Sequence, residues 1–244
     1  MSKSAFRLAL EDAIEQRHSA VHPWSDAWTS GKLNRRLLGE WVKQHYHYVS
    51  HFAEWVAAVY ANCPHQDVQH FLLENVTEEE GLVGMHGAAP VRHSDLLLEF
   101  GEVCGKSRTE ILNAQVNGEL LAETLGLQSW CTVQSRKPFV EALSGLLIGL
   151  ESQVPRIYSK TTPPLLEKYG FSEDEVTFFT IHIAADIEHV AIDRVVAVGG
   201  FVPHHRFRRD FREAHALDRR GRAGEALLDE PGRQADRVEN LRAA

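Results

Sequence analysis

The chain has 244 residues, a formal net charge of −8, and apolar and charged fractions of 43% and 25%. This length suits one large domain or two small ones, and the acidic balance argues against nucleic acid as a partner. The three cysteines form no C-x-x-C pair, which argues against a disulfide framework or a zinc knuckle and is typical of a reducing compartment. We see neither a signal-peptide region nor a segment long enough to span a bilayer, so we expect a cytoplasmic protein without membrane association.

Almost every segment repeats its apolar residues with helical period, and few segments alternate as strands do. In chain order the pattern predicts helices over 4–19, 33–62, 66–80, 94–104, 107–125 and 137–160, followed by one that begins near 172. Glycine and proline separate these helices, at 22–24, 63–64, 81–90, 105, 126 and 162–164. We therefore expect an all-α bundle of about seven helices, with any site built between facing helices.

Local signals refine three of these helices. Ser107 with Glu110 three residues later predicts a capping box, and Ser172 with Glu175 predicts a second one. Pro155 lies inside the predicted helix 137–160, so we expect a kink there.

The end of the chain differs in composition from the rest. From Gly199 onward it has ten arginines and no lysine, and the aliphatic period fades. We therefore predict a helical domain over 1–198 and a separate, Arg-rich segment over 199–244. Three interpretations of that segment stay open: a solvated tail with a helical stretch near 206–217, a docking arm, or an altered reading frame.

The most informative segment carries His182, Asp186 and His189 at positions i, i+4 and i+7. This spacing places the three side chains on one stripe of a helix. Its surroundings are apolar, so three ionisable groups there are costly to bury unless something pairs them. Two imidazoles and a carboxylate suit a borderline transition metal, and iron is the usual one for oxygen chemistry. Each residue taken alone also fits a structural role, hydrogen-bonded to a neighbouring carbonyl.

Two other segments offer partners for this stripe. Glu151 interrupts an apolar run, and its neighbours at i−4 and i+3 are apolar, so we interpret it as a ligand rather than a solvated glutamate. An acidic run ends the predicted helix 66–80 against the helix dipole, which indicates that something stabilises one of these carboxylates. We choose Glu79 with His93, and leave Glu78 and His86 as their alternatives.

The complete candidate set has three carboxylates and three imidazoles. Its members are Glu79, His93, Glu151, His182, Asp186 and His189. Such a set can hold two iron ions with positions open for oxygen.

Beyond the ligand set, the sequence resembles a known family. The stretch 41–48, Trp-Val-Lys-Gln-His-Tyr-His-Tyr, is similar to the long helix of the pyrroloquinoline-quinone synthase and TenA-type proteins, which share the haem-oxygenase-like (TenA/PqqC-like) helical fold. The order Glu, His, mid-chain Glu and His-x-x-x-Asp-x-x-His resembles the haem-oxygenase-like di-iron oxidases. The stretches 151–155 and 169–171 are similar to the chlamydial-type para-aminobenzoate synthase branch. The resemblance covers roughly residues 8–198.

The resemblance implies a non-haem di-iron enzyme that uses O2 to oxidise an amine, an amino acid or a fatty acid. One branch instead consumes its own tyrosine to form para-aminobenzoate; here Ser25 and Thr161 stand where that branch has a tyrosine and a lysine, with Lys160 one residue short. Two further classes stay open: a cofactor-independent oxidase of the quinone-synthase type, with histidines as acid–base groups, and a non-enzymatic helical binding protein.

The remaining expectations concern the pocket and the partners. Tyr46 and Tyr48 are the candidates for lining the pocket, and Lys160 is a candidate for binding a substrate carboxylate, although such tyrosines are more often aromatic core and such a lysine is more often on the surface. We expect two iron ions and O2, a small-molecule substrate, an external electron donor and a homodimer.

Overall fold

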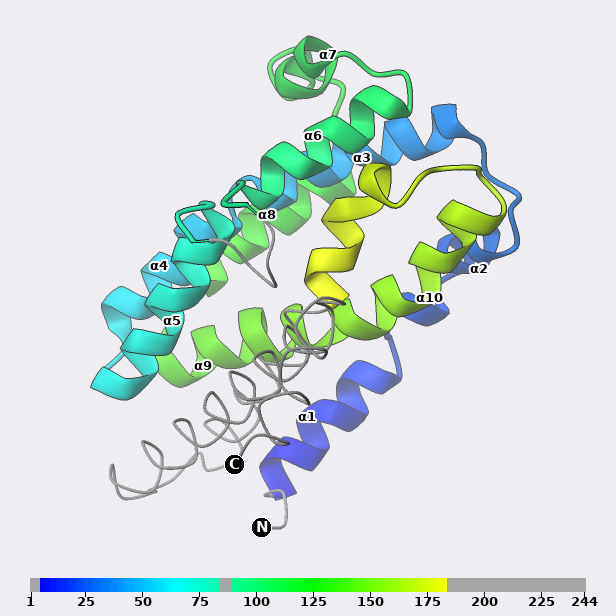
Figure 1. Ribbon diagram of the computed structural model, residues 1–244. Helices are drawn as coiled ribbons and strands as arrows, with labels where there is room; N and C mark the ends of the chain where they lie inside the picture. Colours follow the sequence, from blue (N-terminus) through cyan, green and yellow to red (C-terminus); the bar gives the residue numbers. More distant parts are fainter. Residues whose placement is uncertain (1–4, 84–88, 184–244) are drawn as a thin grey trace, which may run out of the picture. The chain divides into compact units, whose positions relative to one another are not determined.

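The computed structural model describes residues 5–83 and 89–183, and side chains from residue 8 onward (Figure 1). Four sequence predictions therefore lie outside the described residues: His86, Asp186, His189 and the segment 199–244. No helix in the described part of the chain is long and apolar enough to cross a membrane.

The described residues are helical and contain no strand, which confirms the all-α prediction. The helices are shorter and more numerous than the seven expected. In chain order they are α1 (Ala5–Glu15), η1 (Ser19–Val21), α2 (Pro23–Thr29), α3 (Arg35–Val49), α4 (Phe52–Asn62), α5 (Gln66–Glu79), α6 (His93–Val103), α7 (Arg108–Asn113), α8 (Ala122–Gln134), α9 (Phe139–Leu143), η2 (Ser144–Ile148), η3 (Glu151–Gln153), α10 (Val154–Glu167) and η4 (Asp174–Val176). A further helical stretch, 177–183, follows η4.

Side-chain caps explain where several helices begin. Asn34 accepts a hydrogen bond from the Leu37 amide at the start of α3. Both predicted capping boxes are present: Ser107 and Glu110 exchange hydrogen bonds at the start of α7, and Ser172 and Glu175 do so before 177–183. These polar pairs satisfy amide groups that a helix start otherwise leaves open.

Two predicted helices are wrong in their extent. The run 33–62 is divided between α3 and α4 at Ser50 and His51. The helix predicted over 107–125 ends at Asn113, and Gly126, expected to end it, lies inside α8. After Asn113, hydrogen bonds between Gln44 on α3 and both Glu119 and Leu121 hold the chain in an irregular path.

The region around Pro155 also differs from the prediction. The helix expected over 137–160 is interrupted before the proline, because α9 passes into the π-helix η2 and the short 3-10 helix η3. Pro155 lies in the first turn of α10, where its missing N–H is harmless. The turn predicted at 162–164 is wrong, since Pro163 and Pro164 lie inside α10. Burial of one face of α10, including Leu165, holds the helix through this point.

Helix α3 occupies the centre of the described bundle. It packs against α6, α7 and α8, while α4 packs against α5 and α9, and α10 packs against α2. Gly101 on α6 packs against α3 and α7, and an added Cβ would lie 2.6 Å from the Ile111 side chain and 2.9 Å from that of Val42. A larger residue would therefore displace these buried side chains. The core beside it is built from fully buried side chains: Leu38, Val42, Leu97, Phe100, Ile111, Leu165 and Phe179.

Candidate metal centre

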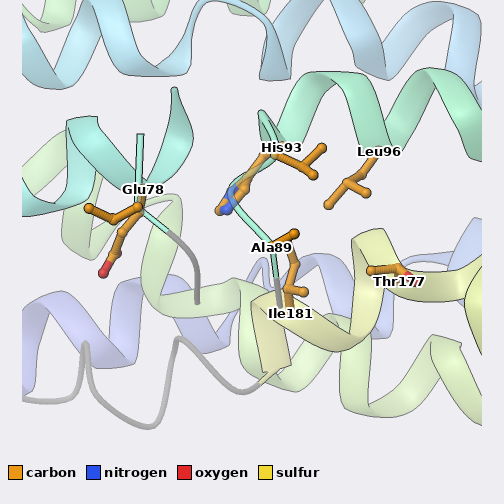
Figure 2. Close-up of a pocket in the computed structure, with 8 residues that line it drawn as sticks. Glu78, Ala89, His93, Leu96, Thr177 and Ile181 are labelled. Atoms are coloured by element: carbon orange, nitrogen blue, oxygen red, sulfur yellow. The ribbon is translucent and has the colours of Figure 1, made fainter. Parts of the chain in front are cut away.

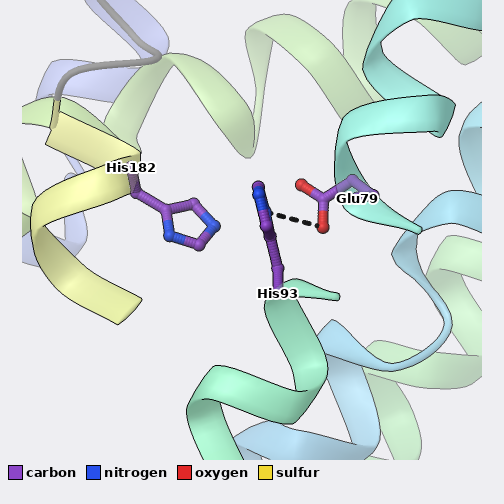
Figure 3. A group of neighbouring side chains, drawn as sticks. All are labelled: Glu79, His93 and His182. Atoms are coloured by element: carbon purple, nitrogen blue, oxygen red, sulfur yellow. Dashed lines mark ion pairs between the residues drawn. The ribbon is translucent and has the colours of Figure 1, made fainter. Parts of the chain in front are cut away.

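Three of the predicted ligands lie together in the structure. Glu79 ends α5, His93 begins α6, and His182 lies in 177–183 (Figure 3). One ligand atom from each of the three lies within 4.8 Å of the other two. We call these three residues the imidazole cluster.

The contacts inside the imidazole cluster are close. His93 Nδ1 lies 3.1 Å from Glu79 Oε2, and the rings of His93 and His182 meet edge to face with centroids 4.5 Å apart. The side chains of His93 and Glu79 are only 4% and 10% exposed. Burying a carboxylate is costly unless a positive charge accompanies it, so this site favours a bound cation or a proton on an imidazole.

A tight return of the chain brings Glu79 and His93 together. Gly81 has φ +63°, and a Cβ at this position would overlap the backbone where Val91 joins Arg92. The segment before α6 therefore lies directly against the end of α5, and an ion pair between Arg92 and Glu80 at 2.9 Å holds it there. This approach accounts for a pairing that the sequence separation alone does not explain.

The ring of His182 is oriented by a hydrogen bond within its own helix. His182 Nδ1 lies 2.6 Å from the Phe178 carbonyl, one turn earlier in the same helix. Because a carbonyl only accepts, Nδ1 carries the proton and the lone pair is on Nε2, which is the usual arrangement for a metal-ligating histidine.

Two further residues beside His182 were missed as candidates by sequence reasoning. Tyr158 from α10 lies with its ring 5.5 Å from that of His182, and His45 Nε2 lies 3.4 Å from the Tyr158 hydroxyl. Burial, followed by the nearby His182, lowers the pKa of His45 to about 3, so His45 is neutral near pH 7. The available signal was the position of His45 on the apolar stripe of α3, between Val42 and Val49.

The predicted pocket residues lie in different surroundings. Burial raises the pKa of Tyr48 well above its usual range, and the charge of Glu151 adds to the effect. Burial raises the pKa of Tyr46 as well, and the second cause of this rise is the negative charge of Asp95 on α6. Lys160 donates to the Ala20 carbonyl at 2.5 Å and pairs with Asp26 at 3.0 Å, so it joins α10 to η1 and α2.

Glu151, the fourth predicted ligand in the described residues, follows an interrupted helix. The π-helix η2 ends three residues before Glu151, and π-turns are frequent at functional sites. Glu151 is half-buried and, like Glu79, acts on the pKa of Tyr48. The alternative ligand Glu78 lines a pocket beside the cluster instead (Figure 2).

The residues present fit an iron ion. A carboxylate oxygen and two imidazole nitrogens are donors that ferrous iron accepts. Asn75 lies one turn before Glu79 on the buried face of α5, is 2% exposed, and its Oδ1 has no hydrogen-bond partner. A buried, unsatisfied oxygen needs an explanation, and water bound at a filled metal site would supply a donor.

Helices that converge on a buried carboxylate and two histidines define an all-α protein with a candidate metal centre. A family model described as an iron-containing redox enzyme, of the haem-oxygenase-like type, matches residues 39–219, and the chain belongs to that family. The haem-oxygenase-like resemblance in the sequence is thereby confirmed.

Several named proteins are similar in sequence to this chain over most of its length. It is 27% identical to a 4-aminobenzoate synthase of Chlamydia muridarum over 77% of this chain and 75% of that protein. It is 29% identical to a 4-aminobenzoate synthase of Nitrosomonas europaea, over 78% and 76%. It is also 22% identical to a pyrroloquinoline-quinone synthase of Acinetobacter baumannii, over 78% and 73%.

Proposed function

We propose that this protein is a non-haem di-iron oxidase or oxygenase that uses O2 to oxidise a small molecule. The observation that carries the proposal is the imidazole cluster, in which Glu79, His93 and His182 offer a buried donor set for iron. Membership of a family of iron-containing redox enzymes supports the choice of metal.

The proposed ligand set extends beyond the cluster. Glu79, His93 and His182 would hold iron from three helical segments, and Glu151 would contribute a second carboxylate. Asp186 and His189 complete the set for two ions, as the sequence spacing predicts. Ferrous iron supplies the electrons that reduce oxygen, and an external donor restores them.

The protein groups around the iron hold protons and exclude water. His182 keeps the proton on Nδ1 through the Phe178 carbonyl, so its orientation is set before metal binds. Tyr48 keeps its phenolic proton near neutral pH, because its pKa is raised well above the usual range. The rings of Tyr158 and Phe178 lie against His182 and provide an apolar wall that limits access of water.

The test is to count iron in the anaerobic protein after loading with ferrous ion and gel filtration. We expect close to two irons per chain in the unaltered protein and a marked loss in His93→Ala. His70→Ala, an exposed histidine on α5, is the matched control and should retain iron. Retention of no iron by the unaltered protein, or equal retention by the two variants, would overturn the proposal.

The relatives favour a second candidate, formation of 4-aminobenzoate from a side chain of the protein itself. The observation in its favour is that the 4-aminobenzoate synthases match about three quarters of the chain. Intact-mass measurement of the iron-loaded protein after reaction with O2 and a reductant separates the two functions. The first proposal expects an unchanged protein mass and the second expects loss of a tyrosine side chain with release of 4-aminobenzoate.

A further inference from the structure

The buried face of α5 carries one amide side chain among apolar ones. Val68, Phe71 and Leu72 are buried on this face. Asn75 follows at the next position of the same helical stripe and is buried as well. Its Oδ1 has no hydrogen-bond partner among the residues that the structure describes. The face therefore holds an unsatisfied acceptor in the interior of the bundle.

An unsatisfied amide oxygen at this position is unfavourable for folding alone. Burial of such a group without a compensating hydrogen bond destabilises the folded state. Leucine has nearly the same shape as asparagine, and the same face already holds Leu72. An apolar residue would therefore serve packing better than Asn75 does. A donor that the polypeptide itself does not supply would account for the asparagine.

Asn75 lies one helical turn before Glu79, the carboxylate of the imidazole cluster. Residues four apart share a face of a helix, with Cβ atoms about 5–6 Å apart. Side chains on a helix lean toward its N-terminus, so the Glu79 carboxylate extends over the turn that contains Asn75. Glu79 also faces His93, with Oε2 3.1 Å from Nδ1 (Figure 3). The amide oxygen and the cluster therefore lie on the same side of α5.

The missing partner of Asn75 must be a hydrogen-bond donor. A carboxylate that binds a cation is ionised and only accepts, so Glu79 is not the donor in a filled site. A cation held by few protein ligands keeps water in its open positions, and a bound water has two hydrogens to donate. Direct ligation by Asn75 is less favourable, because its side chain is one methylene shorter than that of Glu79 and because amide oxygens suit harder cations than two imidazoles select.

We propose that Asn75 is a positioning residue of the metal centre, whose Oδ1 accepts a hydrogen bond from a water molecule on the cation that the imidazole cluster binds. The inference rests on the proposed function, because it requires iron at the cluster. It goes beyond that function by adding a residue that is not a ligand and that orients the water in an open position of the metal.

Asn75→Leu removes the acceptor and keeps the volume of the side chain. We expect the affinity of the anaerobic protein for ferrous ion, measured by competition with a coloured chelator, to fall about tenfold, as for other indirect partners of a metal. Urea unfolding of the same variant without metal should show no loss of stability, because an apolar group replaces an unsatisfied one. A purely structural role predicts the reverse. Unchanged affinity, or lower stability of the metal-free variant, would overturn the inference.

A second variant and a control tie the effect to the acceptor. Asn75→Asp keeps an oxygen acceptor at the same place and should bind ferrous ion at least as tightly as the unaltered protein. Asn62→Leu, an exposed asparagine at the end of α4, is the matched control and should change neither measurement. Weaker binding in Asn75→Asp than in the unaltered protein would count against the role of the acceptor and overturn the inference.

The visible spectrum of the protein loaded with Co²⁺ separates a hydrogen bond to bound water from direct ligation. The intensity of its d–d bands depends on the number and geometry of the ligands. Asn75→Leu should leave this intensity unchanged, because the water stays on the metal when its acceptor is removed. A change in intensity would make Asn75 a ligand and overturn the inference.

Iron is counted in the same samples, so this inference and the proposed function fail separately. Two irons per unaltered chain with equal affinity in Asn75→Leu would remove the role of Asn75 and preserve the function. One iron per chain with about tenfold weaker binding in Asn75→Leu would preserve that role and remove the di-iron function. Retention of no iron by the unaltered protein would overturn both.

Discussion

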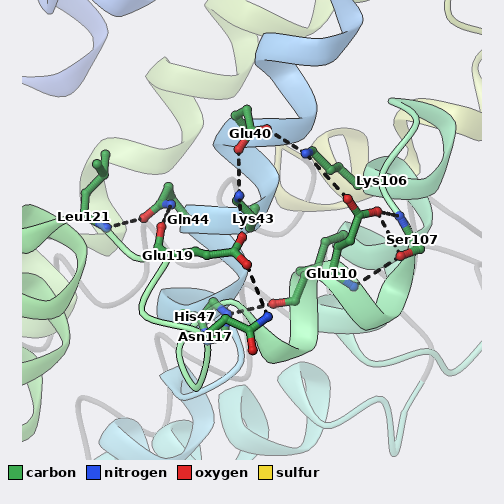
Figure 4. A network of polar contacts seen from close by, with 11 residues as sticks. Glu40, Lys43, Gln44, His47, Lys106, Ser107, Glu110, Asn117, Glu119 and Leu121 are labelled. Carbon is green, nitrogen blue, oxygen red and sulfur yellow. Dashed lines mark hydrogen bonds and ion pairs between the residues drawn. The ribbon is translucent and has the colours of Figure 1, made fainter.

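Two clusters of charged and polar side chains on neighbouring helices are built in opposite ways. The α3 network consists of Glu40, Lys43 and Gln44 on α3 with Lys106 and Glu119 (Figure 4). Lys43 pairs with Glu40 at 3.0 Å and with Glu119 at 2.9 Å, and Lys106 pairs with Glu40 at 2.6 Å. Each carboxylate in this network meets an ammonium group, whereas the imidazole cluster places its carboxylate against an imidazole.

The difference shows what each cluster can do. The α3 network balances its own charges and joins the irregular stretch 114–121 to α3, so it is complete without a ligand. The imidazole cluster brings a carboxylate and two imidazole nitrogens together in a nearly buried site. This arrangement is favourable only when the three groups bind a cation. One cluster therefore holds the chain in position and the other suits a metal.

The largest expected effect comes from neutralising one carboxylate in each cluster. Glu79→Gln keeps the shape of the side chain but removes a charged ligand, and we expect iron affinity to fall by about 100-fold or more, since even indirect partners of a metal are worth about 10–100-fold. Glu119→Gln should leave iron affinity unchanged, because Glu119 pairs with Lys43 at the surface. Competition with a coloured chelator measures both affinities.

The same pair of variants is compared in unfolding of the metal-free protein. Glu79→Gln removes a nearly buried charge, so its loss of stability should be small without metal. Equal iron affinity in the two variants would contradict the distinction between the clusters.

The pH dependence of folding stability provides a second test, at His45 beside the imidazole cluster. His45 has a folded-state pKa of about 3 against an ordinary value of 6.5, so the unfolded chain binds the proton more readily. Stability from the neutral ring is present above about pH 6.5 and is lost as the pH falls toward 3. Between about pH 7.5 and 5 this residue should lower the free energy of unfolding by about 2 kcal/mol.

His45→Gln isolates that contribution. Urea unfolding of both proteins in the presence of a metal chelator gives the free energy at each pH. The other histidines titrate in both proteins, so the difference between the two slopes belongs to His45. Identical slopes would mean that His45 is not held in its neutral form by the fold.

The sequence predicts the helical class because apolar period is local, and it predicts both capping boxes for the same reason. It does not predict the break between α3 and α4 or the end of α7 at Asn113. The second of these depends on a contact between distant segments. The joining of 114–121 to α3 through Gln44 is such a contact.

The candidate site likewise contains some residues that the sequence predicts and others that it does not. His182 is recognisable from spacing with Asp186 and His189, because that pattern lies on one helix. The choice of Glu79 over Glu78 for contact with His93 depends on how the chain returns after Gly81, which no local pattern shows. The sequence does not single out His45, because a histidine among aromatic residues on a buried helix face is usually structural.

The smallest expected effect tests the structural role of the α3 network. The Gln44 side chain accepts hydrogen bonds from the Leu121 amide at 2.9 Å and the Thr124 hydroxyl at 2.8 Å, and donates one to the Glu119 carbonyl at 3.1 Å. Gln44→Ala breaks all three, so the free energy of unfolding should fall by about 1–2 kcal/mol.

Hydrogen exchange at the Leu121 amide reports the same change locally. We expect protection to fall at Leu121 in Gln44→Ala, with iron retention unchanged, because the α3 network is completed by protein groups alone. Gln66→Ala, an exposed glutamine at the start of α5, is the matched control and should alter neither measurement. Loss of iron in Gln44→Ala with full protection at Leu121 would instead show that the α3 network supports the metal centre, and the separation of structural and metal-binding clusters would not hold.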